Sequence, residues 1–165
     1  MKEKVAKRIG MKYGMKSIII GIVFSYCILF IFFLFSGEGL KSIIWFNKLD
    51  SYSLLFILNW IFLFFLFAFI FGVKASKEIL IQKRDYEKVG MKYGVLTLIL
   101  ASLLGCLPGL ISEGMDGFTF KSYGINAYVF KPMFWIIFFG IIPAVLIGKW
   151  FGKKIKSKIL SNSKD

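Results

Sequence analysis

Four apolar runs, at residues 18–35, 54–73, 95–111 and 133–148, constrain the fold more than any other feature. None of them contains Asp, Glu, Lys or Arg, and their lengths approach or reach the roughly 17–25 residues that cross a bilayer as a helix. A mean hydropathy of +0.73 is too high for a soluble domain of this size. The sequence therefore predicts an all-α integral membrane protein with four transmembrane helices, forming a single domain over residues 1–165.

The chain also repeats itself at a distance of 80 residues. The pentapeptide Gly-Met-Lys-Tyr-Gly at 10–14 recurs at 90–94, and Phe-Gly-x-Lys at 71–74 recurs at 151–154. Each copy holds two apolar runs between these matched ends, so the pattern predicts a tandem duplication of a two-helix hairpin. Because each hairpin begins and ends on the same side, an axis along the membrane normal is expected to relate them. The two repeats are placed at about 8–80 and about 88–160.

Lysine and arginine are distributed unevenly along the chain. Residues 1–16, 74–92 and 149–164 hold six each, whereas the two remaining loops together hold four of the 22. The positive-inside rule then predicts a multi-pass cell membrane protein with both termini in the cytoplasm, N-in/C-in. The net charge of +13 is expected to face anionic lipid headgroups on the cytoplasmic side, and no nucleic-acid partner is predicted.

Small residues recur at intervals of three or four in the first and third runs, which places them on one face of each helix. Such residues let transmembrane helices approach closely. The sequence therefore predicts a helix-packing seam, with helices 1 and 3 meeting near the twofold axis. The seam consists of Gly14, Ser17, Gly21, Ser25, Gly94, Thr97, Ala101, Gly105 and Gly109.

The second run has a different character, because seven phenylalanines surround it on all sides. This bulk favours a peripheral helix that faces lipid or docks on another subunit. Asn59 is its only strongly polar residue, and is a candidate intramembrane polar contact between helices or, alternatively, a transport ligand. Pro108 and Pro143 predict a bend near the outer end of helix 3 and a kink in helix 4.

The repeated pentapeptide places a lysine and a tyrosine at the cytoplasmic mouths of helices 1 and 3. Lys12, Tyr13, Lys92 and Tyr93 are expected to contact lipid headgroups. A specific pocket for an anionic lipid or another ligand, formed between the two copies, is the alternative interpretation. The spacing does not fit a phosphate-binding loop.

Two outer loops carry aromatic side chains that are candidates for partner contacts, or that rest in the interface as an aromatic belt. Residues 40–48 predict a short amphipathic helix along the headgroups. Residues 118–130 predict a small hairpin that turns near Tyr123-Gly124. The candidate partner contacts are Trp45, Phe118, Phe120, Tyr123 and Tyr128.

The sequence holds no histidine and only two cysteines, both in apolar runs. It shows no catalytic residue, no metal ligand set and no cofactor motif. We therefore expect a non-catalytic protein that acts through protein or lipid interaction, as a subunit or regulator of a membrane complex or as an immunity-type protein against a membrane-active toxin. A protein partner or a homo-oligomer is expected. The alternative is a homo-oligomeric channel or small-solute transporter, although few polar groups lie at membrane depth. The Lys-, Ile- and Phe-rich composition suggests a bacterial source.

Overall fold

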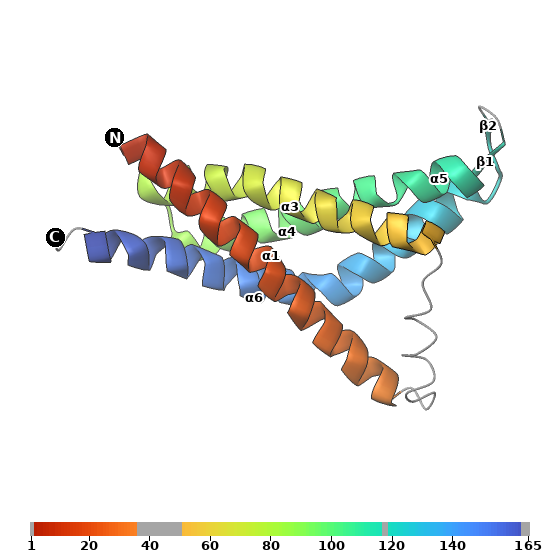
Figure 1. The fold of residues 1–165 in the computed structure, drawn as a ribbon, viewed down its shortest axis with the longest axis horizontal. Coiled ribbons are helices and arrows are strands. Elements are labelled where there is room, and N and C mark those ends of the chain that lie inside the picture. The colour runs from red at the N-terminus through yellow and green to blue at the C-terminus, as the bar shows by residue number, and fades with distance from the viewer. Residues whose placement is uncertain (1, 36–50, 117–118, 163–165) are drawn as a thin grey trace.

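The computed structural model describes residues 2–35, 51–116 and 119–162, which Figure 1 draws as ribbon. Four helices among these residues are long and apolar enough to cross a membrane, which confirms the prediction of an all-α membrane protein. The main helices are α1 (Lys2–Phe35), α3 (Ser51–Leu80), α4 (Tyr86–Gly105) with its continuation α5 (Leu107–Glu113), and α6 (Lys131–Asn162). The short elements are β1 (Met115–Asp116), β2 (Thr119–Phe120) and the π-helix η1 (Asn126–Phe130).

The helices pack as two antiparallel pairs, α1 with α3 and α4 with α6. The start of α1, the turn between α3 and α4, and the end of α6 lie at the same end of the bundle (Figure 1). This end is referred to below as the terminal end. The turn there ends at Asp85, which caps the start of α4. Its carboxylate accepts a hydrogen bond of 2.9 Å from the backbone N–H of Glu87.

Glycines allow the backbones to touch within each pair. A Cβ atom added to Gly14 on α1 would lie 2.6 Å from the carbonyl oxygen of Ala68 on α3. A Cβ added to Gly94 on α4 would lie at the same distance, 2.6 Å, from the carbonyl oxygen of Ala144 on α6. Any side chain at these positions would overlap the neighbouring backbone. Helices α1 and α4 therefore need glycine here to approach their partners closely.

The two pairs differ in register by one helical turn. In the first pair Gly10 packs on Gly72, and the 80-residue spacing would place the corresponding contact between Gly90 and Gly152. Gly90 does lie near Gly152, but it packs most closely on Gly148, four residues earlier on α6. The contacts therefore match Ala-x-x-x-Gly at 68–72 with Ala-x-x-x-Gly at 144–148, a spacing of 76 residues rather than the expected 80.

Two packing expectations are wrong. The glycines of α1 and α4 do not face each other in the described part of the chain, because Gly14 packs on α3 and Gly94 packs on α6. The phenylalanine-rich helix α3 is not peripheral, since it contacts α1, α4 and α6. Its Phe62 is 63% exposed, but Leu63 and Ala68 are buried. A stripe of small residues shows that a helix packs closely, and not which neighbour it packs against.

The prolines behave differently in the two later spans. Pro108 lies at the start of α5, after α4 has ended at Gly105, so the expected bend of helix 3 is a break between two helices. Pro143 lies inside α6, which continues through it. The expected hairpin of residues 118–130 is misplaced: β1 and β2 pair Met115 with Phe120 and Asp116 with Thr119, whereas 126–130 are helical.

The most buried apolar side chains gather near the terminal end. Ala75 and Ile79 of α3 pack there against Val89 and Tyr93 of α4 and Ile155 of α6. A smaller cluster of Cys106, Leu110 and Val129 lies at the opposite end. The half of α1 farthest from the terminal end contributes no described side chain to either cluster, and it diverges from the other helices (Figure 1).

Candidate functional site

An apolar cavity of about 350 Å³ lies between the four spans. It is lined by residues 14–26 of α1, 57–72 of α3, 90–98 of α4 and 140–151 of α6, with gaps in each range. It begins where Gly14 of α1 meets α3. From there it extends away from the terminal end, as the two helices separate. Helices α4 and α6 line its remaining sides. This space is referred to below as the central cavity.

Three of the five hydroxyl groups on the wall of the central cavity, at Ser17, Tyr93 and Thr97, donate hydrogen bonds to the protein. Ser17 donates to the carbonyl oxygen of Gly14 at 2.6 Å, and Thr97 donates to that of Tyr93 at 2.8 Å. Bonds of this kind satisfy the donor within its own helix. The wall therefore offers mainly apolar surface, including the side chains of Trp60 and Phe71.

Tyr93 joins the central cavity to a polar cluster at the terminal end. Its ring packs on Phe71 with 5.5 Å between centroids, and its hydroxyl donates a hydrogen bond of 2.5 Å to Glu78. The same carboxylate lies 3.1 Å from the guanidinium of Arg84 and 3.9 Å from the ammonium of Lys92. Tyr93 is thus a buried structural residue rather than the headgroup contact that was expected.

The two copies of the pentapeptide have different surroundings. Tyr13 packs, partly buried, against the same cluster of side chains that contains Tyr93, so the structure brings the two tyrosines into one region. Lys12 is exposed, and the Lys92 ammonium lies 5.1 Å from the centre of the Tyr93 ring. A pocket lined by both copies is the central cavity itself, through Gly14, Gly90 and their neighbours, but neither lysine lines it.

A second hollow, of about 330 Å³, lies at the terminal end beside the polar cluster. It is lined by the basic side chains of Arg84, Lys88 and Lys92 and by the acidic side chains of Glu78 and Asp85. Since positions 84, 88 and 92 are four residues apart, the basic groups follow one side of the chain at the start of α4. Sequence reasoning did not single out this hollow.

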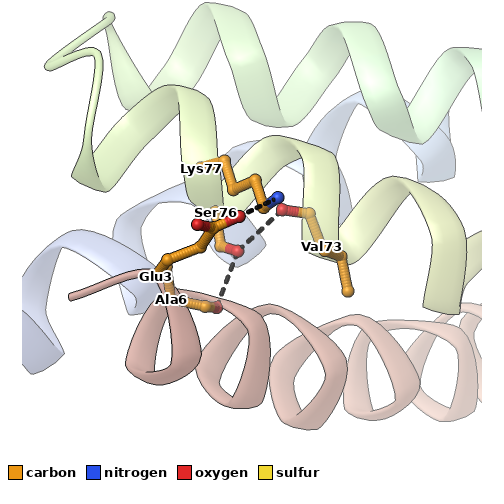
Figure 2. Close-up of polar contacts among 5 residues, drawn as sticks. All are labelled: Glu3, Ala6, Val73, Ser76 and Lys77. Atoms are coloured by element: carbon orange, nitrogen blue, oxygen red, sulfur yellow. Dashed lines mark hydrogen bonds and ion pairs between the residues drawn. The ribbon is translucent and has the colours of Figure 1, made fainter. Parts of the chain in front are cut away.

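Sequence reasoning also missed Ser76, a fully buried residue that fastens α3 to α1 (Figure 2). Its hydroxyl oxygen lies 2.7 Å from the carbonyl oxygen of Ala6 and 2.9 Å from that of Val73, so its proton is shared between two helices. The ammonium of Lys77 forms an ion pair of 2.5 Å with Glu3 nearby. The spacing of Ser76 from Gly72 by four residues is the signal that places both on one face.

The predicted seam residues divide between two roles. In α1, Gly14 is buried against α3, whereas Ser17, Gly21 and Ser25 line the central cavity. A Cβ added to Gly21 would make an ordinary contact of 3.5 Å with Ile147 of α6. In α4 and α5 most of the seam is buried, and a Cβ on Gly105 would overlap the ring of Trp60 on α3. The buried residues are Thr97, Ala101, Gly105 and Gly109. Gly94 is half-buried, and both Gly94 and Thr97 also line the central cavity.

The remaining candidates do not converge on either cavity. Asn59 does not line the central cavity, and its Nδ2 is the one buried side-chain nitrogen or oxygen without a hydrogen-bond partner among the described residues. Phe120 and Tyr123 are exposed near the β1–β2 pair, while Tyr128 packs against the Cys106 cluster. Trp45 and Phe118 lie outside the described residues. The expected amphipathic helix of residues 40–48, which contains Trp45, lies outside them as well.

The chemistry available to these sites is that of packing and charge. Among the residues that the structure describes, no group of three His, Cys, Asp or Glu side chains is placed to hold a metal ion. Comparison with protein-family models, with curated proteins and with solved structures gave no match to this chain. The fold and the two cavities are therefore the basis for a functional proposal.

Proposed function

We propose that this chain is a non-catalytic bacterial cell membrane protein that acts through contacts with lipids and with a protein partner or a second copy of itself. Both termini face the cytoplasm in this proposal, and the two helix pairs descend from a duplicated hairpin. A subunit of a membrane complex, a regulator and an immunity-type protein all belong to this class. The proposal is supported above all by the gathering of the basic segments at one end of the bundle.

Three basic segments that are distant in sequence lie at the terminal end: the start of α1, the α3–α4 turn and the end of α6 (Figure 1). Of the described acidic residues there, Glu3 and Glu78 form ion pairs with basic side chains. Each additional Lys or Arg near an anionic membrane surface contributes about 1 kcal/mol of attraction. The terminal end is thus suited to anionic phospholipid headgroups.

The hollow beside Glu78 gives this attraction a specific place. Lys88 lines it and is exposed, and Glu78 holds Arg84 and Lys92 on either side. A phosphate group placed there would meet the basic side chains of Arg84, Lys88 and Lys92, which lie at or just before the start of α4. The two carboxylates in the hollow limit the preference, so we expect moderate affinity that falls as ionic strength screens the charges.

A matched pair of lysine substitutions tests this proposal. The purified protein is reconstituted in vesicles with and without phosphatidylglycerol, and the lipid retained after detergent extraction is measured. We expect enrichment of phosphatidylglycerol that Lys88→Gln lowers by about fivefold, since ~1 kcal/mol corresponds to that factor. Lys131→Gln, at the opposite end of the bundle, serves as the control and should leave retention unchanged.

Equal retention of anionic and zwitterionic lipid would contradict the proposal. Copurification of a stoichiometric protein from mild detergent would identify the partner. A rise in ion or dye flux through protein-containing liposomes, abolished by Asn59→Leu, would favour the channel or transporter class instead. These measurements separate the alternatives without requiring a known ligand.

A further inference from the structure

The central cavity has the shape and surroundings of a binding site inside the membrane. It begins at the contact between Gly14 and α3, and on α3 its lining extends from Gly72 back to Ile57. At 1.5 Å per helical residue this length is about 22 Å. The cavity is therefore elongated along the helices rather than compact.

Most residues that line the central cavity belong to the four apolar runs, so most of the cavity is expected at hydrocarbon depth. The others extend the lining toward the terminal end; they are Gly14, Ser17, Gly90, Tyr93, Gly94 and Phe151. Its hydroxyls at Ser17 and Thr97 already donate within their own helices. Apolar cavities exclude water: an engineered one of about 150 Å³ stays dry and binds benzene. At about 350 Å³, this cavity is more than twice that size.

We propose that the central cavity binds one acyl chain of a membrane phospholipid, which enters from the side between the outer halves of α1 and α3. This deepens the proposed lipid interaction, on which it rests, by naming the part of the lipid and its place in the fold. The half of α1 farthest from the terminal end stands away from α3 (Figure 1), and Ser25 and Tyr26 are the last residues of α1 that line the cavity. The acyl chains of the bilayer are the surrounding solvent at this depth.

The dimensions favour an acyl chain over a helix from a protein partner. A helix about 10–12 Å across with its side chains and about 22 Å long occupies on the order of 2,000 Å³. This exceeds the empty space between the cavity walls, which is about 1410 Å³ with the open sides included. An acyl chain is long, narrow and flexible, and makes dispersion contacts along its length. Trp60 and Phe64 of α3 and Ile147 of α6 provide such contacts.

The proposal is tested with a phospholipid that carries a photoreactive diazirine on one acyl chain. The full-length protein is reconstituted with this lipid and irradiated, and the labelled residues are mapped by mass spectrometry. We expect labelling of cavity residues such as Ile22, Ile57 and Trp60, together with labelling of the exposed side chains Trp135 and Phe138 on α6 by surrounding lipid.

Two substitutions fill the cavity. Ser25→Phe and Ile22→Phe add bulk to its lining and should abolish labelling of Trp60 while labelling of Trp135 persists. Val23→Phe adds an equally large ring on α1 at a position that is 58% exposed and outside the lining, so it should leave both labels unchanged. Circular dichroism checks that each variant retains its helical content.

The outcomes are distinguishable from those of the headgroup experiment. If Trp60 is unlabelled in the unsubstituted protein, or remains labelled in both folded cavity-filling variants, the central cavity does not hold an acyl chain. That result would leave the phosphatidylglycerol enrichment at Lys88 intact. Loss of enrichment with persistent cavity labelling would instead reject the headgroup site and retain the acyl-chain site.

Discussion

The hydroxyl of Tyr93 on α4 donates a hydrogen bond of 2.5 Å to Glu78 on α3, across the boundary between the two helix pairs. Tyr93 also lines the central cavity, so this one residue contacts the apolar interior and the charged terminal end. Glu78 in turn binds Arg84 in the α3–α4 turn. The contact therefore holds the second pair against the first at the point where the chain passes between them.

Removing this hydroxyl should weaken the association of the two pairs. We expect Tyr93→Phe to lower the free energy of unfolding by about 1 kcal/mol, because a hydrogen bond to a largely buried carboxylate is lost. Tyr86→Phe is the matched control, since that hydroxyl contacts the exposed Glu87 at 3.3 Å and should have no measurable effect. Titration with denaturing detergent, followed by circular dichroism, provides the measurement; equal effects of the two substitutions would contradict the assignment.

The glycine contacts predict a strong dependence on position within α1. Gly14→Ala should destabilise the protein by roughly 1–3 kcal/mol, because the added Cβ would overlap the backbone of α3. Gly21→Ala should be neutral or stabilising by up to about 1 kcal/mol, since alanine favours helix and the added Cβ makes only an ordinary contact. Detergent unfolding compares the two variants. Similar losses at both positions would indicate that the whole stripe is packed, as the sequence alone suggested.

The buried hydroxyl of Ser76 should stabilise the first helix pair. Ser76→Ala removes its shared hydrogen bond to Ala6 and is expected to lower the free energy of unfolding by about 0.5–1.5 kcal/mol. Ser157→Ala removes a comparable hydroxyl from an exposed site on α6, where Ser157 donates to Lys154 of its own helix. Little change is expected there. Protection of the α1 amides from hydrogen exchange should fall only in the Ser76 variant.

The unpartnered amide of Asn59 leads to the opposite prediction. Asn59→Leu should leave stability unchanged or raise it by about 1–3 kcal/mol, because a buried donor without an acceptor among the described residues is removed. Thermal unfolding in detergent gives the comparison. A clear loss of stability would mean that this amide has a hydrogen-bond partner in the membrane, such as a second subunit, and would support the interhelical role that its sequence context suggested.

Much of the architecture was accessible from the sequence because transmembrane character depends on each segment separately. The four apolar runs identified the spans, and Gly14 and Gly94 were recognised as sites of close approach. The break at Pro108 was also expected, although as a bend. The hairpin was misplaced, since the paired residues are Met115–Asp116 and Thr119–Phe120, whereas residues 126–130 are helical.

The sequence by itself identified the four segments that are long and apolar enough to cross a membrane, and predicted that the basic segments share one end, since hydrophobic length and charge are local properties. The tertiary structure alone decided that Gly14 packs on α3 and Gly94 on α6, with a difference of one turn between the pairs. It also brought Glu78 to Tyr93 and formed the central cavity. A small-residue face fits several neighbouring helices almost equally well, so its partner is selected only when all the side chains are packed together.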